Sequence, residues 1–195
     1  WWEWDIDYSL VDCIEIWNSL GVYRQRGREE DEALSKWNEL LNAGYKITGI
    51  GGSDSVHAGQ PEDHKPGNPI TYVFAEKLTE ADIMKGIKEG RVVVSKGLRL
   101  ITTVSYDGQR YEVGDRIRLR QTDTITVHAG TDFSQSHRLQ LVKNGEIIAE
   151  QNLDEPSQIE WHVDVKAGDW LRSQVWDLNG KLLAFTNPLY MTSKA

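Results

Sequence analysis

Residues 45–57 read YKITGIGGSDSVH, in which a predicted buried strand runs into two glycines and then into an aspartate and a histidine. The preceding segment, residues 29–43, places apolar side chains at helical spacing behind four acidic residues, and Gly44 is a typical helix stop. Residues 10–17, LVDCIEIW, predict an earlier and mostly buried strand. A strand, a helix and a strand with continuous apolar runs are typical of a parallel α/β sheet or barrel.

The same α/β pattern continues to residue 97. Residues 70–75 predict a third strand and residues 92–94 a fourth. Between them, Thr79 is predicted to cap a helix that ends at Gly90, with Asp82 in the capping-box position. Leu78 and Ile83 are expected at the two hydrophobic-staple positions, and Ile83, Met84 and Ile87 are expected to face inward.

Residues 98–195 have a different pattern, because their apolar stretches are short, mostly alternate with polar residues, and show no helical period. Asn-Gly and Asp-Gly dipeptides separate several of them and predict tight hairpins. We therefore predict a second domain, an immunoglobulin-like antiparallel β-sandwich of about seven or eight strands. Its strands are expected at residues 98–105, 117–120, 124–128, 139–142, 146–149, 159–165, 170–176 and 181–185. Trp170 and Trp176 share a face with Arg172 and Gln174, a face expected to pack against the first domain.

Composition excludes some classes of partner. The chain of 195 residues carries 30 acidic and 22 basic side chains, for a formal net charge of −8. This balance argues against a nucleic acid or an anionic membrane as the main partner. No apolar run approaches the ~20 residues that a membrane helix needs, so we expect a soluble protein, cytoplasmic or exported. Cys13 is the single cysteine and leaves the redox compartment undetermined.

The best candidate for chemistry is the segment that follows the predicted strand at residues 45–50. Its position is the carboxyl end of a parallel strand, where α/β folds keep their active sites. Asp54 and His57 offer oxygen and nitrogen donors that suit Zn, Mn or Fe, and Ser53 lies beside them. The alternative is a surface turn in which Asp54 bonds local amide groups.

Glu15 and Asn18 form a second group of candidates. Glu15 lies within an apolar strand, so it either faces a polar cleft or pairs with an arginine such as Arg24 or Arg91. Asn18, at the end of that strand, lines the same cleft as Asp54 or caps the next turn. His64 is a weaker ligand candidate in a proline-rich loop. The remaining histidines, His128, His137 and His162, share no spacing and are interpreted as structural or surface residues.

Several motifs, in this order, resemble the last part of a PHP-domain metallohydrolase. They are DCIEIWN at residues 12–18, the helix around Trp37, and IGGSDSVH at residues 50–57. The motifs PITYV at residues 69–73, GRVVVS at residues 90–95 and TNPLY at residues 186–190 resemble the CehA/McbA-type branch of that family. The resemblance runs through nearly the whole chain.

The resemblance implies that residues 1–97 are the C-terminal part of a distorted (β/α)7 barrel and that residues 98–195 are the β-sandwich of this branch. It implies divalent metal ions (Zn, Mn or Fe) and hydrolysis of phosphate or carboxylic and carbamate esters. Asp54 matches the aspartate of the family's final Asp-x-His motif, whereas His57 comes one residue late. The early His-x-His pair is absent. We therefore expect a fragment that is inactive without the missing upstream barrel segment or a second copy of the chain.

Two functions stay open at this point. In the first, the chain is part of a metal-dependent hydrolase of a small-molecule ester, with Asp54 as metal ligand, His57 as ligand or proton donor, and Glu15 and Asn18 lining the cleft. In the second, the β-sandwich is a non-catalytic binding module for a glycan or a protein, and the α/β part is a remnant.

Overall fold

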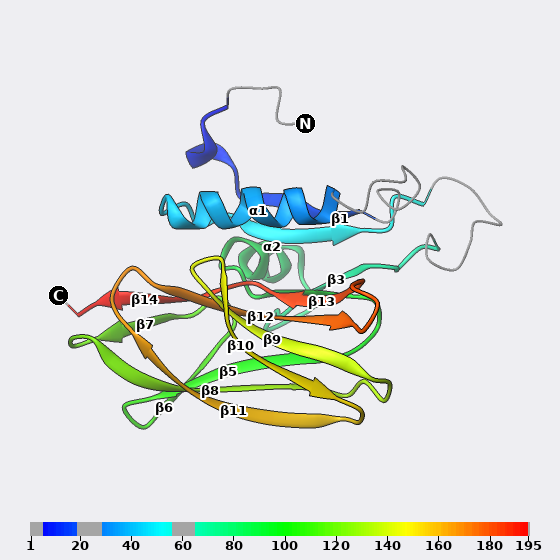
Figure 1. The fold of residues 1–195 in the computed structure, drawn as a ribbon. Helices are drawn as coiled ribbons and strands as arrows, with labels where there is room; N and C mark the ends of the chain where they lie inside the picture. Colours follow the sequence, from blue (N-terminus) through cyan, green and yellow to red (C-terminus); the bar gives the residue numbers. More distant parts are fainter. Residues whose placement is uncertain (1–5, 19–28, 56–64, 195) are drawn as a thin grey trace.

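The computed structural model describes residues 6–18, 29–55 and 65–194 of the chain. Over these residues the protein is mostly β, with two α-helices and several sheets (Figure 1). A 3₁₀ turn at Tyr8–Leu10 is followed in chain order by β1 (Cys13–Asn18), α1 (Glu29–Asn42), β2 (Thr48–Gly52), β3 (Ile70–Val73), α2 (Glu80–Lys88), β4 (Val92–Ser95), β5 (Leu100–Tyr106), β6 (Gln109–Glu112), β7 (Arg116–Leu119), β8 (Asp123–Thr131), β9 (His137–Lys143), β10 (Glu146–Leu153), β11 (Ser157–Val165), β12 (Trp170–Asp177), β13 (Leu182–Thr186) and β14 (Leu189–Ser193).

Two sheets form a β-sandwich, as the alternating pattern predicts. The larger sheet has the order β10-β9-β12-β13-β4-β3, with β14 paired to β12 and β7, and the smaller has the order β11-β8-β5-β6. Buried side chains of both sheets, such as Val127 from the smaller and Leu141 from the larger, share one apolar cluster. The turns at residues 107–108, 144–145 and 179–180 each join neighbouring antiparallel strands, which confirms the hairpins predicted from their Asp-Gly and Asn-Gly dipeptides.

Two strands of the sandwich were not predicted from the sequence. β6 is a short, mostly exposed edge strand without an apolar pattern. β14 pairs in parallel with β7, with Tyr190 opposite Arg116, so the sandwich is not purely antiparallel. The Asp-Gly turn at residues 107–108 predicts the β5–β6 hairpin but not the extent of β6, and the pairing of β14 with β7 joins segments distant in sequence.

A further layer, formed by α1, β1 and β2 and called the α/β layer below, covers the outer face of the larger sheet (Figure 1). β1 and β2 pair in parallel from Cys13 opposite Thr48 to Asn18 opposite Gly52, as the α/β pattern predicts. α1 begins and ends where predicted and packs against β1. Its buried Trp37 donates a hydrogen bond from Nε1 to the carbonyl oxygen of Ile47, at 2.8 Å, which ties the helix to the start of β2.

The parallel pattern does not extend to β3 and β4, and this part of the prediction is wrong. The two strands pair antiparallel, and β4 also pairs antiparallel with β13 of the sandwich. β4 is apolar on both faces because it lies between two cores and not because it belongs to a parallel sheet. Val92 and Val94 pack toward the α/β layer, while Val93 packs into the core between the two sandwich sheets. The hydrogen-bonded sheet therefore crosses residue 97, where the sequence places the boundary between domains.

One apolar core joins the α/β layer to the larger sheet. Ile16, Trp17 and Trp37 of the layer lie in the same cluster as Trp170 and Phe185 of the sandwich. The ring centres of Trp37 and Phe185 are 5.6 Å apart. The prediction that the face of β12 with its tryptophans packs against the first part of the chain is confirmed.

Buried polar groups fix how the layer sits on the sheet. Asn187 accepts a hydrogen bond from the Gly49 amide and donates one to the Gly49 carbonyl, both at 2.8 Å. Arg172 is fully buried with its guanidinium carbon 5.4 Å from the centre of the Trp37 ring, and burial lowers the pKa of Arg172 to about 9. It remains charged at neutral pH without a carboxylate partner among the described residues.

The cap of α2 agrees with the sequence, but its packing does not. The Thr79 hydroxyl accepts a hydrogen bond from the Asp82 amide, as the capping box predicts. Leu78 is 94% exposed, so its predicted staple contact with Ile83 is wrong, and Met84 is 46% exposed, so its predicted inward packing is wrong. Gly86 is the buried residue of this helix instead, because an added Cβ would lie 2.8 Å from the Phe74 carbonyl. In the described ranges, no helix is both long enough and apolar enough to cross a membrane.

Candidate functional site

The carboxyl ends of β1 and β2 bring together Asn18 and Asp54. Because the strands are parallel and Asn18 lies opposite Gly52, β1 and β2 both end at the same edge of the sheet. The Asn18 side-chain amide donates a hydrogen bond from Nδ2 to Oδ2 of Asp54, at 3.2 Å. This contact places Asn18 beside Asp54, whereas the alternative, a cap on the next turn, lies outside the described residues.

Glu15 lies in the same group. It is exposed on the face of β1 opposite the buried Ile14 and Ile16. Partial burial raises the pKa of the Glu15 carboxyl, the charge of Asp54 raises it further, and a hydrogen bond with Asn18 lowers it. A cation at this acidic edge would be stabilised by the Glu15 and Asp54 carboxylates together.

The alternative pairing of Glu15 with Arg91 is wrong. Arg91 instead makes ion pairs with Glu89 at 3.1 Å and with Asp115 at 3.3 Å. Arg24, the other proposed partner, lies outside the described residues. The pairing of Glu15 with Arg24 stays a prediction, and among the described residues the charge of Asp54 acts on Glu15.

The glycines before Asp54 serve packing as well as the turn. A Cβ on Gly51 would lie 2.6 Å from a Val94 methyl group, and one on Gly52 would lie 3.2 Å from Oε1 of Glu15. The Thr71 hydroxyl bonds both the amide and the carbonyl of Gly51, at 3.0 and 2.6 Å. The turn itself occurs at Asp54, which adopts φ of 46°, a left-handed conformation that Asp tolerates better than most residues.

The remaining predicted site residues are only partly placed. Ser53 follows β2 and is half-buried next to Asp54. His57 and His64 lie outside the described residues, so their proposed roles stay predictions. Within the ranges that the structure covers, no group of three or more His, Cys, Asp or Glu side chains is close enough to hold a metal ion together.

The donors at this edge fit a divalent cation in kind. Asp54 and Glu15 supply carboxylate oxygens, and the Asn18 amide already orients Asp54. Mn and Fe accept such oxygen donors readily, and Zn adds a preference for imidazole. Catalytic metal centres use about three protein ligands, so two carboxylates need at least one more donor.

Two histidines that share no sequence spacing, His128 and His162, both contact Glu160 across strands of the smaller sheet. Glu160 contacts His128 at 3.5 Å on one oxygen and His162 at 3.5 Å on the other. The Ser105 hydroxyl lies 3.1 Å from Nε2 of His128. The register of β8 and β11 brings these side chains together, since Glu160 lies opposite His128 on the neighbouring strand. Sequence spacing alone does not reveal it.

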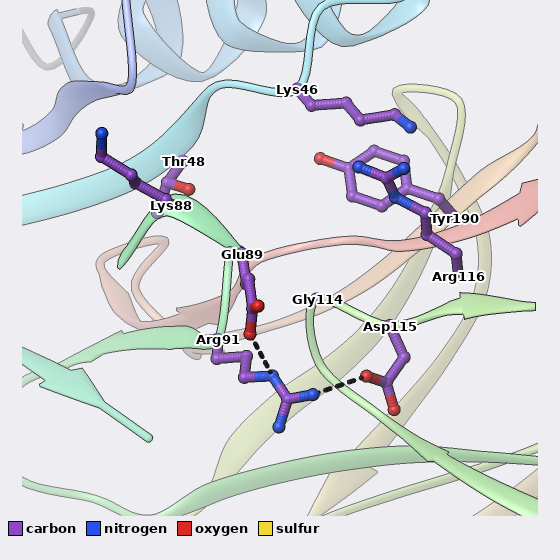
Figure 2. A pocket seen from close by; sticks show the side chains of 10 residues that line it. Lys46, Thr48, Lys88, Glu89, Arg91, Gly114, Asp115, Arg116 and Tyr190 are labelled. Carbon is purple, nitrogen blue, oxygen red and sulfur yellow. Dashed lines mark hydrogen bonds and ion pairs between the residues drawn. The ribbon is translucent and has the colours of Figure 1, made fainter. Parts of the chain in front are cut away.

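Sequence reasoning also missed a basic cavity at the opposite end of β2, where Lys46 and Arg116 face Tyr190 (Figure 2). The motif containing Tyr190 was noted only for its resemblance, and Lys46 belongs to the stretch that precedes β2. The basic residues that line the cavity, Lys46, Lys88, Arg91 and Arg116, are separated in the sequence, and only the fold brings them together.

No protein-family model matches the chain, and no curated protein matches it either. The resemblance to PHP-domain metallohydrolases thus remains a prediction from the motifs quoted above.

Proposed function

We propose that the chain is the C-terminal part of a metal-dependent hydrolase that acts on phosphate esters or on carboxylic and carbamate esters. The observation that carries the proposal is the Asn18–Asp54 hydrogen bond at the carboxyl end of a parallel strand pair, with Glu15 beside it. Catalytic side chains of α/β enzymes gather at this edge of the sheet. The resemblance assigns Asp54 to the metal site at the same place.

A bound divalent ion would supply a water of lowered pKa and would polarise the ester oxygen. Asp54 would hold this ion, and Asn18 holds Oδ2 of Asp54 in place through its amide. Glu15 keeps a proton to higher pH than an ordinary glutamate, because its pKa is raised. This side chain would line the cleft beside the ion, as a second carboxylate next to Asp54. His57 would complete the ligands or donate a proton to the leaving group.

The site needs further elements to work. Among the described residues, β1 and β2 pair only with each other. Parallel strands usually belong to larger sheets, since two strands alone leave edges with unpaired backbone groups. We propose that the missing upstream barrel segment, or a second copy of the chain, pairs with this edge and supplies the remaining ligands. The small-molecule ester would bind between them.

Manganese titration of the purified chain tests the metal site. We expect Mn²⁺ to bind weakly, with Kd of about 1 mM, because two carboxylates hold a divalent ion poorly. Asp54→Asn should abolish this binding, as measured by electron paramagnetic resonance of free Mn²⁺. The matched control Asp154→Asn, in the segment between β10 and β11, should leave it unchanged. Equal binding in Asp54→Asn and the parent chain would contradict the proposed metal site.

An ester assay tests the dependence on a partner element. The chain alone should not hydrolyse p-nitrophenyl phosphate or p-nitrophenyl acetate in the presence of Mn²⁺. A monodisperse monomer that hydrolyses either ester, with loss of activity in Asp54→Asn, would support hydrolysis but contradict the need for a partner. Sedimentation on the same sample establishes the oligomeric state.

The second candidate function, a binding module for a glycan or a protein, is favoured by one observation. A cavity of about 330 Å³ lies along β3 and the segment before β5, and Tyr72 and Phe74 line it with 42% and 57% of their surface exposed. Exposed aromatic faces suit the apolar faces of sugars and of peptide side chains. Saturable binding of a soluble oligosaccharide that is lost in Phe74→Ala, with Mn²⁺ binding absent, would favour this function over hydrolysis.

A further inference from the structure

A cavity of about 260 Å³ lies where the α/β layer meets the sandwich, at the end of β2 away from Asp54. Its walls are the start of β2, the turn after α2, the turn before β7, and β14. Gly114 allows the two turns to touch, since a Cβ there would lie 2.4 Å from the Glu89 carbonyl oxygen. Figure 2 shows the side chains of Lys46, Arg116 and Tyr190 gathered on one side of this cavity.

The cavity has more positive than negative charge, although the whole chain is acidic. Four basic side chains line it, Lys46, Lys88, Arg91 and Arg116, against two acidic ones, Glu89 and Asp115. Both acids are engaged by Arg91, at 3.1 and 3.3 Å (Figure 2). Lys88 pairs with Asp12 at 3.3 Å. Among the described residues, Lys46 and Arg116 have no carboxylate partner.

These two cations also repel each other. Burial lowers the pKa of the Lys46 amine, and the charge of Arg116 lowers it further. The Lys46 amine lies 5.6 Å from the centre of the Tyr190 ring, so the aromatic face offsets part of its charge. A group with two or more negative oxygens between Lys46 and Arg116 would remove the repulsion.

The rest of the lining provides neutral donors and satisfied acceptors. Burial raises the pKa of the Tyr190 phenol, so it stays protonated and able to donate, and no described residue hydrogen-bonds to its hydroxyl. Figure 2 shows this hydroxyl pointing into the space between Arg116 and Thr48. Two carbonyls in the last turn of α2 accept hydrogen bonds from the chain itself. The Ile87 carbonyl accepts from the Thr48 hydroxyl at 2.6 Å, and the Gly86 carbonyl accepts from the Arg91 amide at 2.9 Å.

We propose that this cavity binds a phosphate group, of inorganic phosphate or of a phosphate monoester, through Arg116, Lys46 and the Tyr190 hydroxyl. Arginine presents paired N–H donors that match phosphate oxygens, and the lysine adds a point charge. A volume of about 260 Å³ holds a phosphate group with several waters, since each water takes about 30 Å³. The site is separate from the strand-end carboxylates and does not depend on the proposed hydrolysis.

Calorimetric titration of the full chain with sodium phosphate, at constant ionic strength and with EDTA present, tests the proposal. EDTA removes divalent ions, so phosphate cannot bind through a metal at Asp54. We expect saturable binding with Kd of about 1 mM or tighter, and at least about tenfold weaker binding in Arg116→Gln and in Lys46→Gln. A parallel titration with glycerol 2-phosphate separates the two sources. Equal affinity identifies the phosphate group alone, and tighter binding identifies a monoester.

The matched control is Arg118→Gln, an exposed arginine on the same strand that does not line the cavity. It should keep the affinity within about twofold of the parent chain. Asp54→Asn should also leave phosphate binding unchanged. A lack of saturable binding up to about 10 mM phosphate, or equal losses in Arg116→Gln and Arg118→Gln, would overturn the proposal. Amide resonances of Thr48, Gly90 and Gly114 should shift on titration, which checks the location even if one variant folds poorly.

Discussion

The smaller sheet of the sandwich and the α/β layer differ in where their partners lie in the sequence. In the smaller sheet, β5 and β6 form a hairpin, and β8 and β11 alternate apolar with polar residues. In the layer, Trp37 packs on Phe185, and Gly49 exchanges hydrogen bonds with Asn187, 138 positions away. Local patterns therefore describe the first region well. The second is held by contacts that form only when distant segments meet.

This difference predicts that the layer and the larger sheet unfold together. Trp37→Ala should give the largest effect, a loss of about 3–5 kcal/mol in the free energy of unfolding, because a fully buried side chain and its hydrogen bond to Ile47 are both removed. Urea unfolding followed by circular dichroism measures the loss. Hydrogen exchange should show faster exchange in β12 and β13 as well as in β2.

Leu178→Ala is the control, because Leu178 is 54% exposed, and it should change the free energy of unfolding by less than about 0.5 kcal/mol. Faster exchange confined to α1, β1 and β2 in Trp37→Ala would show that the layer unfolds by itself. The sequence-based boundary at residue 97 would then describe the cooperative units better than the shared core does.

A smaller effect separates packing from charge at the same interface. Arg172 is fully buried, and its Nε has no hydrogen-bond partner among the described residues. Arg172→Met keeps most of the volume and removes a buried charge, so it should change the free energy of unfolding by less than about 1.5 kcal/mol. Arg172→Ala should cost about 2–4 kcal/mol because it leaves a cavity beside Trp37. Chemical denaturation compares the two, and equal losses would show that the guanidinium itself is required.

The smallest expected effect concerns Glu15, at the exposed edge of the layer. Its folded-state pKa is raised, so the folded state binds this proton more tightly than the unfolded chain does. The associated stability is present below the unfolded pKa and is lost as pH rises through the folded value. Carbon-13 NMR titration of the Glu15 carboxyl should show a lower pKa in Asp54→Asn, since the repelling charge is gone.

The control for this titration is Asp154→Asn, which should leave the pKa of Glu15 unchanged. Glu15→Gln should remove the corresponding part of the pH dependence of unfolding. An unchanged Glu15 pKa in Asp54→Asn would show that the two carboxylates do not interact, and it would weaken the proposed metal site.

Much of the candidate site could be predicted because parallel strands obey a simple rule. Asn18 and Asp54 follow two predicted strands, and the carboxyl ends of parallel neighbours meet at one edge. The phosphate cavity could not be predicted in this way. Lys46, Arg116 and Tyr190 come from three segments, and their meeting depends on the parallel pairing of β7 with β14.

The sequence by itself determined the helices, most strands, the hairpin turns and the group of polar residues after β1 and β2. These features depend on periodicity, capping and glycine or asparagine turn chemistry within a few residues. Only the tertiary structure decided that β3 and β4 join the sandwich. A strand such as VVVS at residues 92–95 is apolar on both faces whether helices or two stacked layers cover it. The sequence records that both faces are buried, and long-range packing selects what buries them.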